Sequence, residues 1–319
     1  METYNITSGI DDNYVQHFAV TLVSLFLTNK PHKFHIYLLT LNVTEEHKKQ
    51  LKELICSYSH EITFIPINKN DISNFPIKKT DYLSLATYLR LLIPQKIPST
   101  INKVLYIDSD IIFNANIQEL YLTDLSRYSV AAVEDAPNQN PIRLGYDIKD
   151  KYFNAGVLLL NLKYLRENNF TTCAFSYIQN NNEKIILHDQ DVLNALLHGT
   201  VLFLPIKWNM LDCFYFHTPR IAPIYLPDLQ LYKKYPCIIH YSGPIKPWHW
   251  GKAHPLKHLY KYYLSYIPWS TQKHFDFSGI KKLDHTLKIF ILLGFSLDQS
   301  KRIKKTMQKI KKIILNLKQ

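Results

Sequence analysis

The chain has 319 residues, 46% of them hydrophobic, so it is long enough to bury a full core, and we expect one large domain with an appendage. Its longest apolar stretch, residues 289–293, is far shorter than the ~20 residues that cross a bilayer, so we do not expect an integral membrane protein. The formal net charge of +12 does not by itself indicate nucleic-acid binding, because most of it lies in residues 281–319.

Two features bear on the cellular compartment. The four cysteines, Cys56, Cys173, Cys213 and Cys237, lack the paired spacing of zinc or thioredoxin motifs, and we expect reduced thiols. The first residues show no charged segment followed by an apolar core of signal-peptide length. We therefore expect a cytoplasmic location.

Strand-like and helix-like segments alternate along the chain. Apolar runs predict strands at 5–8, 34–40, 61–67, 104–107, 130–133, 156–160, 201–204 and 237–241. Helical periodicity predicts helices at 15–28, 44–58, 83–93 and 192–198. This alternation predicts an α/β fold with a mainly parallel central sheet flanked by helices. Residues 209–234, rich in aromatic residues and proline, predict an irregular region.

Polar residues follow several of these strands, where ligands of such sheets bind. Asp11 and Asn13 follow the first strand, and they either contact a ligand or cap the helix that begins there. Asp108 and Asp110 follow the fourth strand, and their spacing in an extended segment points both carboxylates the same way. Such a pair suits Mg²⁺ or Mn²⁺ with a substrate phosphate. The alternative is a surface turn, in which Asp and Ser are common.

Four further positions carry candidate side chains. Arg90 lies in an apolar helix, where it pairs with a buried acid or reaches a phosphate. Asn154 precedes small residues that allow close approach at the start of a strand. Asp189 opens a helix, a position that acids also take for structural reasons. His240 ends the last strand, and a glycine turn and Lys246 follow, which suits an imidazole ligand and a phosphate cradle.

The carboxyl-terminal tail carries most of the charge. Residues 281–319 contain eleven Lys or Arg against Asp284 and Asp298, a net of +9, which leaves +3 for the first 280 residues. Within the tail, apolar side chains recur at helical spacing, at Ile303, Met307, Ile310, Ile314 and Leu317.

A basic amphipathic helix of this kind is typical of the interface of an anionic bilayer. Docking on its own domain or on a partner subunit is the alternative. The tail lacks interleaved aromatic residues for base stacking, so we expect no nucleic-acid partner. We place the tail at residues 261–319 and the catalytic domain at residues 1–260.

Six sequence blocks, in one order, resemble the retaining glycosyltransferases of family eight, whose members include bacterial lipopolysaccharide hexosyltransferases and glycogenin. The blocks are GIDDNY (9–14), ATYLR (86–90), VLYIDSD (104–110), YFNAG (152–156), HDQDVLN (188–194) and HYSGPIKPWH (240–249). They are most similar to the lipopolysaccharide core galactosyl- and glucosyltransferases.

This resemblance implies a GT-A type nucleotide-sugar-binding fold, a UDP-galactose or UDP-glucose donor, a manganese-type ion (Mn²⁺ or Mg²⁺) and transfer with retained anomeric configuration. It implies a glycolipid acceptor, which is a lipopolysaccharide or lipooligosaccharide core. We expect the irregular region at residues 209–234 to face this acceptor. With such an acceptor, we expect a peripheral protein on the inner face of the cytoplasmic membrane, bound through its tail.

The resemblance also assigns roles to single residues. Asp108, Asp110 and His240 correspond to the metal ligands, and the ion also holds the UDP diphosphate. Lys246 corresponds to a second positive contact with the phosphates, and Gly243 leaves room for them. The ion and these contacts would stabilise the departing diphosphate.

The remaining assignments concern the donor. Asp11 and Asn13 correspond to contacts with uracil and ribose, and Ser109 lies between the metal-binding carboxylates. The residues that correspond to contacts with the donor sugar are Arg90, Asn154, Ala155, Asp189 and Gln190.

Retention requires either a covalent sugar–enzyme adduct or a front-face route. An amide is a poor nucleophile, so Gln190 favours the front-face route, in which a phosphate oxygen takes the acceptor's proton. Asp189 is the nearest carboxylate that would serve as nucleophile otherwise.

The sequence leaves three alternative functions open. A nucleotidyltransferase also uses paired carboxylates and a divalent ion, but the sequence shows no Gly-rich basic loop for a triphosphate. A glycosyltransferase of the same fold that acts on another glycan or on a protein is the second. A catalytically silent sugar-binding protein is the third, and it would tolerate the loss of Asp108 or Asp110.

Overall fold

The computed structural model describes most of the first 270 residues. The described residues are 3–72, 75–76, 84–135, 142–147, 150–216, 225–249, 254–270 and 305. Contacts divide the chain into two units, Met1–His240 and Tyr241–Gln319, which are described separately below. The boundary at residue 260 expected from the sequence rests on charge rather than on contacts, and it stays a prediction.

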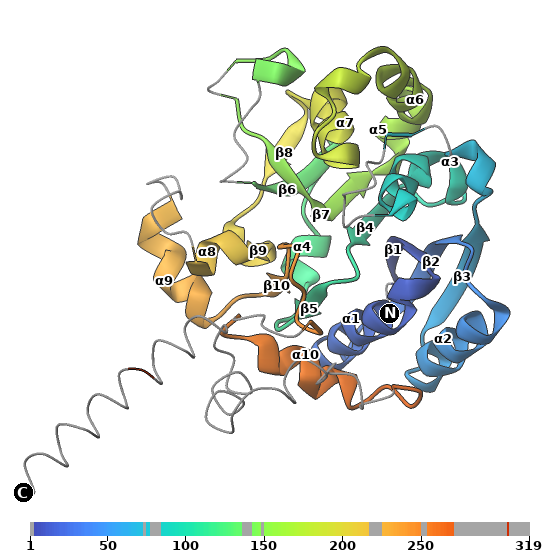
Figure 1. Cartoon of the computed structure of the whole chain (residues 1–319), viewed down its shortest axis with the longest axis vertical. Coiled ribbons are helices and arrows are strands. Elements are labelled where there is room, and N and C mark those ends of the chain that lie inside the picture. The colour runs from blue at the N-terminus through green and yellow to red at the C-terminus, as the bar shows by residue number, and fades with distance from the viewer. Residues whose placement is uncertain are drawn as a thin grey trace, which may run out of the picture. The chain divides into compact units, whose positions relative to one another are not determined.

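A seven-stranded sheet forms the centre of the first unit (Figure 1). In chain order its strands are β1 (Thr3–Asp11), β2 (Lys33–Leu41), β3 (Glu61–Pro66), β4 (Lys103–Ile107), β6 (Val130–Glu134), β7 (Phe153–Asn161) and β8 (Val201–Phe203). Their spatial order is β3-β2-β1-β4-β7-β6-β8, and β7 alone runs antiparallel to its neighbours. The predicted α/β fold with a mainly parallel sheet is confirmed.

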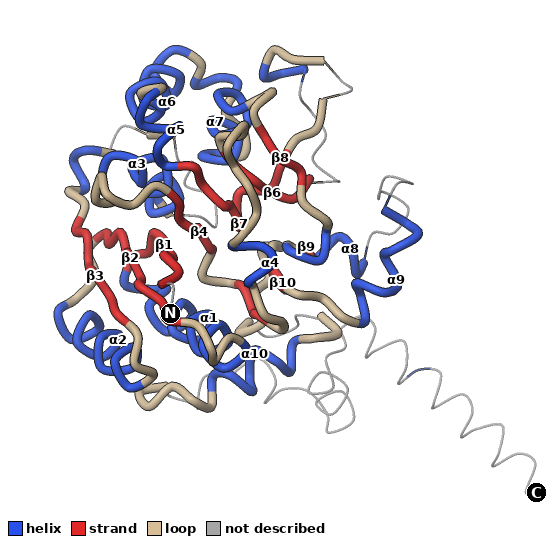
Figure 2. Tube along the Cα trace, turned by 180° about the vertical axis from the view of Figure 1, so that it is seen from behind, coloured by secondary structure: helices blue, strands red, loops and turns tan. Residues whose placement is uncertain are grey.

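Helices cover both faces of this sheet (Figure 2). The helices α1 (Val15–Thr28) and α2 (Glu45–Ser57) pack on one face. The other face carries a 3₁₀ helix (Leu85–Leu92) with α3 (Ile93–Lys96), α5 (Leu162–Glu167), α6 (Phe170–Asn180) and α7 (His188–Leu197). Because both faces are covered, the central strands are mostly apolar, and β6 is buried over its whole length.

A second, three-stranded sheet lies beside the first within this unit. It consists of β5 (Ile111–Phe113), β9 (Met210–Leu211) and β10 (Ile238–His240), in the order β5-β10-β9. Near it are α4 (Gln118–Tyr121), α8 (Asp212–Phe216) and α9 (Leu226–Lys234) (Figure 1).

Two strand pairings bring distant parts of the sequence to one edge of the central sheet. Because β7 runs antiparallel to β4, its first residues lie beside the last residues of β4, and Asp108 N donates to Gly156 O at 2.9 Å. Because β10 runs antiparallel to β5, His240 lies opposite Ile111 and so next to Asp110. A site that combines three sequence regions follows from these two pairings.

The described part of the second unit contains a loop and the helix α10 (Lys257–Leu264). Within it, the Tyr241 hydroxyl donates to Leu256 O at 2.8 Å, and the rings of Trp248 and Tyr260 lie 5.4 Å apart. Across all the described residues, no helix combines the length and hydropathy that a membrane span requires. Apart from Lys305, the predicted amphipathic helix of the tail lies outside the described residues.

The structure corrects two predictions about local structure and adds two helices that were not predicted. The segment predicted as a helix at 83–93 forms mainly a 3₁₀ helix, followed by the short α3. Residues 209–234, predicted to be irregular, include β9, α8 and α9 among those described. The helices α5 and α6 were not predicted, since Asn169 interrupts their periodicity with a left-handed backbone (φ 49°).

His60 makes the stability of the fold depend on pH. Its ring is buried 4.2 Å from the ring of Phe26, and Nδ1 accepts a hydrogen bond from Phe34 N at 3.4 Å. Burial, with Lys33 nearby, lowers the pKa of His60 to about 4. The unfolded chain, with a pKa near 6.5, therefore binds more protons between pH 6.5 and 4, and stability falls as the pH is lowered through this window.

We expect His60 to account for a loss of about 3 kcal/mol in the free energy of unfolding between pH 7 and pH 4. Urea unfolding at both pH values checks this, with His60→Phe expected to be less sensitive to pH than the wild type. His258→Phe, at an exposed position, is the control and should keep the wild-type difference. An equal pH dependence in wild type and His60→Phe would contradict the assignment.

Candidate functional site

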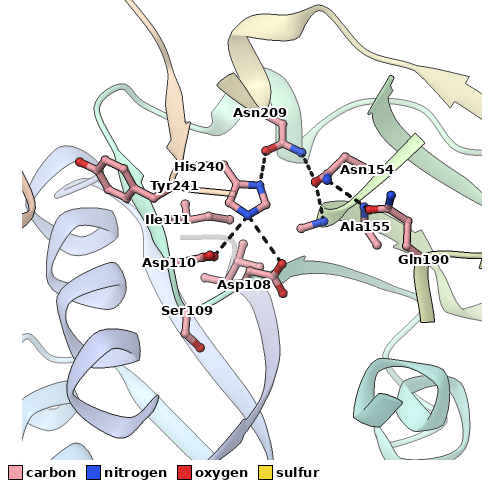
Figure 3. Close-up of polar contacts among 12 residues, drawn as sticks. Asp108, Ser109, Asp110, Ile111, Asn154, Ala155, Gln190, Asn209, His240 and Tyr241 are labelled. Carbon is pink, nitrogen blue, oxygen red and sulfur yellow. Dashed lines mark hydrogen bonds and ion pairs between the residues drawn. The ribbon is translucent and has the colours of Figure 1, made fainter. Parts of the chain in front are cut away.

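Two carboxylates and an imidazole meet at the carboxyl end of β4 (Figure 3). Asp108 and Asp110 come directly after this strand, and His240 ends β10. His240 Nε2 lies 3.8 Å from Asp108 Oδ2 and 3.3 Å from Asp110 Oδ1. One ligand atom from each residue fits within 4.8 Å of the others, so the structure brings the three predicted metal ligands together.

The protonation of His240 suits a cation at this position. The ring is buried, and its Nδ1 lies 2.9 Å from Asn209 Oδ1. An amide oxygen only accepts, so Nδ1 donates to it, and in the neutral ring the lone pair is then on Nε2, which faces the two carboxylates. A lone pair beside two anionic oxygens is unfavourable unless a cation lies between them. A metal-binding histidine commonly donates its other N–H in this way, so the residues present fit a divalent cation.

Gly156 provides the space for this cluster. A Cβ atom at residue 156 would lie 2.2 Å from His240 Cε1 and 2.9 Å from Asp108 Oδ2. Neither contact is possible without movement of the ring or the carboxylate. The small residues seen in the sequence at the start of β7 therefore allow close approach of side chains from two other strands.

Arg90 joins the two acidic parts of the site. Its guanidinium donates to Asp108 Oδ1 at 2.8 Å and to Ala155 O at 2.6 Å, and it lies 2.9 Å from Asp189 Oδ2. It also lies 4.4 Å from the centre of the Tyr106 ring. Burial opposes its charge, but Asp108 and Asp189 raise the pKa of Arg90 above its usual value. Arg90 therefore holds the carboxylates of Asp108 and Asp189 in one arrangement.

Asp189 is held from two sides. The Thr87 hydroxyl donates to Oδ1, and Arg90 binds Oδ2. Burial raises the pKa of Asp189, although the charge of Arg90 and the Thr87 hydroxyl act in the opposite direction. With 3% of its surface exposed, this carboxylate is poorly placed to attack a sugar.

An amide cluster lies beside the three predicted metal ligands (Figure 3). Gln190 Oε1 accepts from Ala155 N at 2.9 Å and from Asn154 Nδ2 at 3.1 Å. Gln190 Nε2 donates to Asp135 Oδ2 at 2.9 Å. The predicted donor-sugar residues from β7 and α7 are thus in direct contact with one another.

The contacts of the remaining predicted site residues in the first unit do not by themselves indicate a ligand. Asp11 ends β1, and its carboxylate accepts from Asn13 N at 3.0 Å, which is the capping contact considered as the alternative. Ser109 is buried, and its carbonyl oxygen accepts from the Thr21 hydroxyl at 3.1 Å. The expected contacts of Asp11 and Asn13 with uracil and ribose stay predictions.

Gly243 and Lys246 belong to the second unit. Within that unit the buried Lys246 Nζ donates to Tyr241 O at 3.0 Å. The expected contact of these two residues with a phosphate also stays a prediction.

Two residues of the site were not identified from the sequence. Asp135 follows β6 in the same way that Asp108 follows β4, so an acid after an apolar run was an available signal. Asn209 is fully buried next to His240, but it precedes a strand of only two residues and carries no sequence signal of its own.

Comparison with known proteins gives a consistent result. The profile of the family described as "Glycosyl transferase family 8" matches residues 5–251. General stress protein A of Bacillus subtilis is 30% identical over 279 residues, which cover 85% of this chain and 96% of that protein. The lipopolysaccharide 1,2-glucosyltransferase of Escherichia coli K12 is 29% identical over 298 residues, 90% of this chain and 86% of that one.

Among solved structures, the galactosyltransferase LgtC in complex with donor and acceptor sugar analogues is similar, with a TM-score of 0.73. It is 25% identical in sequence, and the match covers 86% of this chain and 99% of that one.

Proposed function

Because the chain belongs to glycosyl transferase family 8 and is therefore a glycosyltransferase with a GT-A fold, we propose that it moves galactose or glucose from a UDP-sugar to a lipopolysaccharide core acceptor. Relatives with glucosyltransferase and galactosyltransferase names support the hexose and the acceptor class. We further propose Mn²⁺ as the ion and retention of the anomeric configuration.

The observation that carries this proposal is the cluster of Asp108, Asp110 and His240. These three side chains would hold the ion, and a divalent ion bound there would neutralise the charge that develops on the UDP diphosphate as the sugar leaves. The buried cation that pairs with Asp108 is Arg90, and its guanidinium is also paired with Asp189.

The residues around Arg90 are suited to orient a hexose. Asp189, Asn154 and Gln190 present a carboxylate and two amides, which together donate to and accept from sugar hydroxyls. Their positions are held by Arg90, by Ala155 N and by Asp135. A preorganised set of this kind binds one orientation of a hydroxyl better than another, and it is where we place the choice between galactose and glucose.

The arrangement favours the front-face route for retention. Both oxygens of Asp189 are engaged, and Gln190 is an uncharged amide whose oxygen accepts two hydrogen bonds. A protein nucleophile at either position would first have to break these contacts. Isolation of a sugar covalently bound to Asp189 during turnover would contradict the front-face route.

Purified protein incubated with Mn²⁺ and a panel of UDP-sugars tests the proposed function. We expect UDP release with UDP-galactose or UDP-glucose, the hexose donors of the proposed function. EDTA should abolish release and excess Mn²⁺ should restore it. Equal release in EDTA would contradict metal dependence, and no release with any UDP-hexose would contradict the donor class.

The tail extends the proposal to the location of the protein. We propose that the basic segment 281–319 binds the inner face of the cytoplasmic membrane, where a lipid-anchored acceptor would be presented. Eleven Lys or Arg in this segment support attraction to anionic headgroups, at about 1 kcal/mol for each residue near the surface.

Sedimentation with lipid vesicles tests the tail. Full-length protein should bind vesicles that contain phosphatidylglycerol, bind less at high salt, and bind poorly to phosphatidylcholine alone. A variant that ends at residue 280 should stay in solution and still release UDP. Unchanged vesicle binding by this variant would contradict the role of the tail.

A further inference from the structure

Asn209 lies at the junction of the metal ligands and the donor-sugar residues, although neither the sequence motifs nor the family resemblance singles it out. Its side chain is fully buried and makes two contacts that the site depends on. Oδ1 lies 2.9 Å from His240 Nδ1, and Nδ2 donates to Asn154 Oδ1 at 2.9 Å (Figure 3). No other described residue contacts both His240 and Asn154 through side-chain hydrogen bonds.

The hydrogen bonds around Asn209 run in one direction. Backbone N–H groups only donate, so Ala155 N identifies the oxygen of the Gln190 amide, and Gly156 N identifies the oxygen of the Asn154 amide. Asn154 Oδ1 must therefore accept from Asn209 Nδ2. This leaves Asn209 Oδ1 to accept from His240, so the backbone of β7 determines which ring nitrogen carries the proton.

From this chain we infer that Asn209 is a positioning residue for both halves of the site. It holds the imidazole of His240 through Nδ1, so that Nε2 faces Asp108 and Asp110, where a divalent cation would bind, and it fixes the amide of Asn154, one of the proposed donor-sugar residues. The inference rests on the proposed function, since it concerns the same cation and donor.

The two contacts predict separable effects. Asn209→Leu has a similar volume and removes both contacts, so His240 loses the acceptor that fixes its tautomer and ring plane. Loss of such a partner of a metal-binding histidine typically weakens metal binding by about 10- to 100-fold. Asn209→Asp keeps an oxygen for His240 Nδ1–H but has no N–H for Asn154, so it should affect the donor and not the metal.

The experiment measures binding of Mn²⁺ to the full-length protein without a donor, from the electron paramagnetic resonance signal of free Mn²⁺. We expect Asn209→Leu to bind Mn²⁺ at least tenfold more weakly than wild type. Asn209→Asp should bind within about threefold of wild type, while its KM for the UDP-hexose rises about fivefold, the effect of one lost hydrogen bond.

A matched control removes a buried amide elsewhere. Asn29 is equally buried, and its side chain donates to Leu25 O and accepts from Ile117 N. Asn29→Leu should lower the stability of the fold but leave the Mn²⁺ affinity of the folded protein unchanged. If Asn29→Leu and Asn209→Leu weaken Mn²⁺ binding equally, the role of Asn209 is merely structural and the inference is overturned.

The outcomes also separate this inference from the proposed function. If the wild type binds Mn²⁺ and Asn209→Leu binds it with the same affinity, the inference is overturned and the metal-dependent function is unaffected. No Mn²⁺ binding by wild type overturns both. If Asn209→Leu does not fold, the Asn209→Asp variant tests the inference alone. Mn²⁺ binding by Asn209→Asp that is tenfold weaker than that of wild type, or a KM for the UDP-hexose equal to that of wild type, would overturn the inference.

Discussion

Asp110→Asn is expected to lower UDP release from the preferred UDP-hexose by a factor on the order of a hundred or more, at saturating Mn²⁺. The substitution keeps the size of the side chain and removes one of two anionic metal ligands. Asp110 is buried and lies 3.3 Å from His240 Nε2, so water cannot easily replace the lost oxygen. An initial-rate assay of UDP release, with Mn²⁺ varied from micromolar to millimolar, measures the effect.

The control for this prediction is Asp124→Asn, which removes one negative charge from an exposed loop and should keep the wild-type rate. Near-UV circular dichroism of both variants shows whether tertiary packing is kept. An Asp110→Asn protein that is folded and releases UDP at the wild-type rate would contradict the ion-binding role.

The strands of the central sheet and the position of the two carboxylates after β4 were predictable because their signals are local. An apolar run such as residues 130–133 indicates a strand that is buried on both faces of a sheet. A carboxylate directly after such a run indicates the edge of the sheet where ligands bind. Asp108 and Asp110 carry both signals, and the structure places them as expected. The position of His240 was harder to predict, because its proximity to the two carboxylates depends on the pairing of β10 with β5. The strand β5 has three residues, too few for a periodic pattern to reveal it.

The parts that the sequence did not reveal depend on strand direction and on long-range contacts. Nothing in the residues of β7 shows that it runs antiparallel to β4, yet this direction brings Asn154 to the edge where Asp108 lies. The 3₁₀ helix from Leu85 was predicted as a helix from its apolar spacing, but spacing does not distinguish a repeat of three from one of 3.6 over eight residues. Asn209 acquires its role only from neighbours that are 31 and 55 residues away.

Gly156→Ala is the second change with a large expected effect, because it adds one carbon where the metal ligands meet. The new Cβ would lie 2.2 Å from His240 Cε1 and 2.7 Å from His240 Nδ1, well inside van der Waals contact. Backbone movement is restrained, since Gly156 N donates to Asn154 Oδ1 and Gly156 O accepts from Asp108 N, both at 2.9 Å. The imidazole must therefore move, and it loses its contact with Asn209.

We expect Gly156→Ala to abolish measurable Mn²⁺ binding and to lower UDP release at least a hundredfold, with a loss of about 1–3 kcal/mol in the free energy of unfolding from overpacking. The double variant Gly156→Ala/His240→Ala separates the two effects. Removing the ring removes the two closest contacts and leaves only the one with Asp108 Oδ2, so adding Gly156→Ala to His240→Ala should cost less stability than adding it to wild type, while UDP release stays absent. Additive losses of stability in this cycle, or wild-type Mn²⁺ binding by Gly156→Ala, would show that His240 does not occupy the position on which the metal site depends.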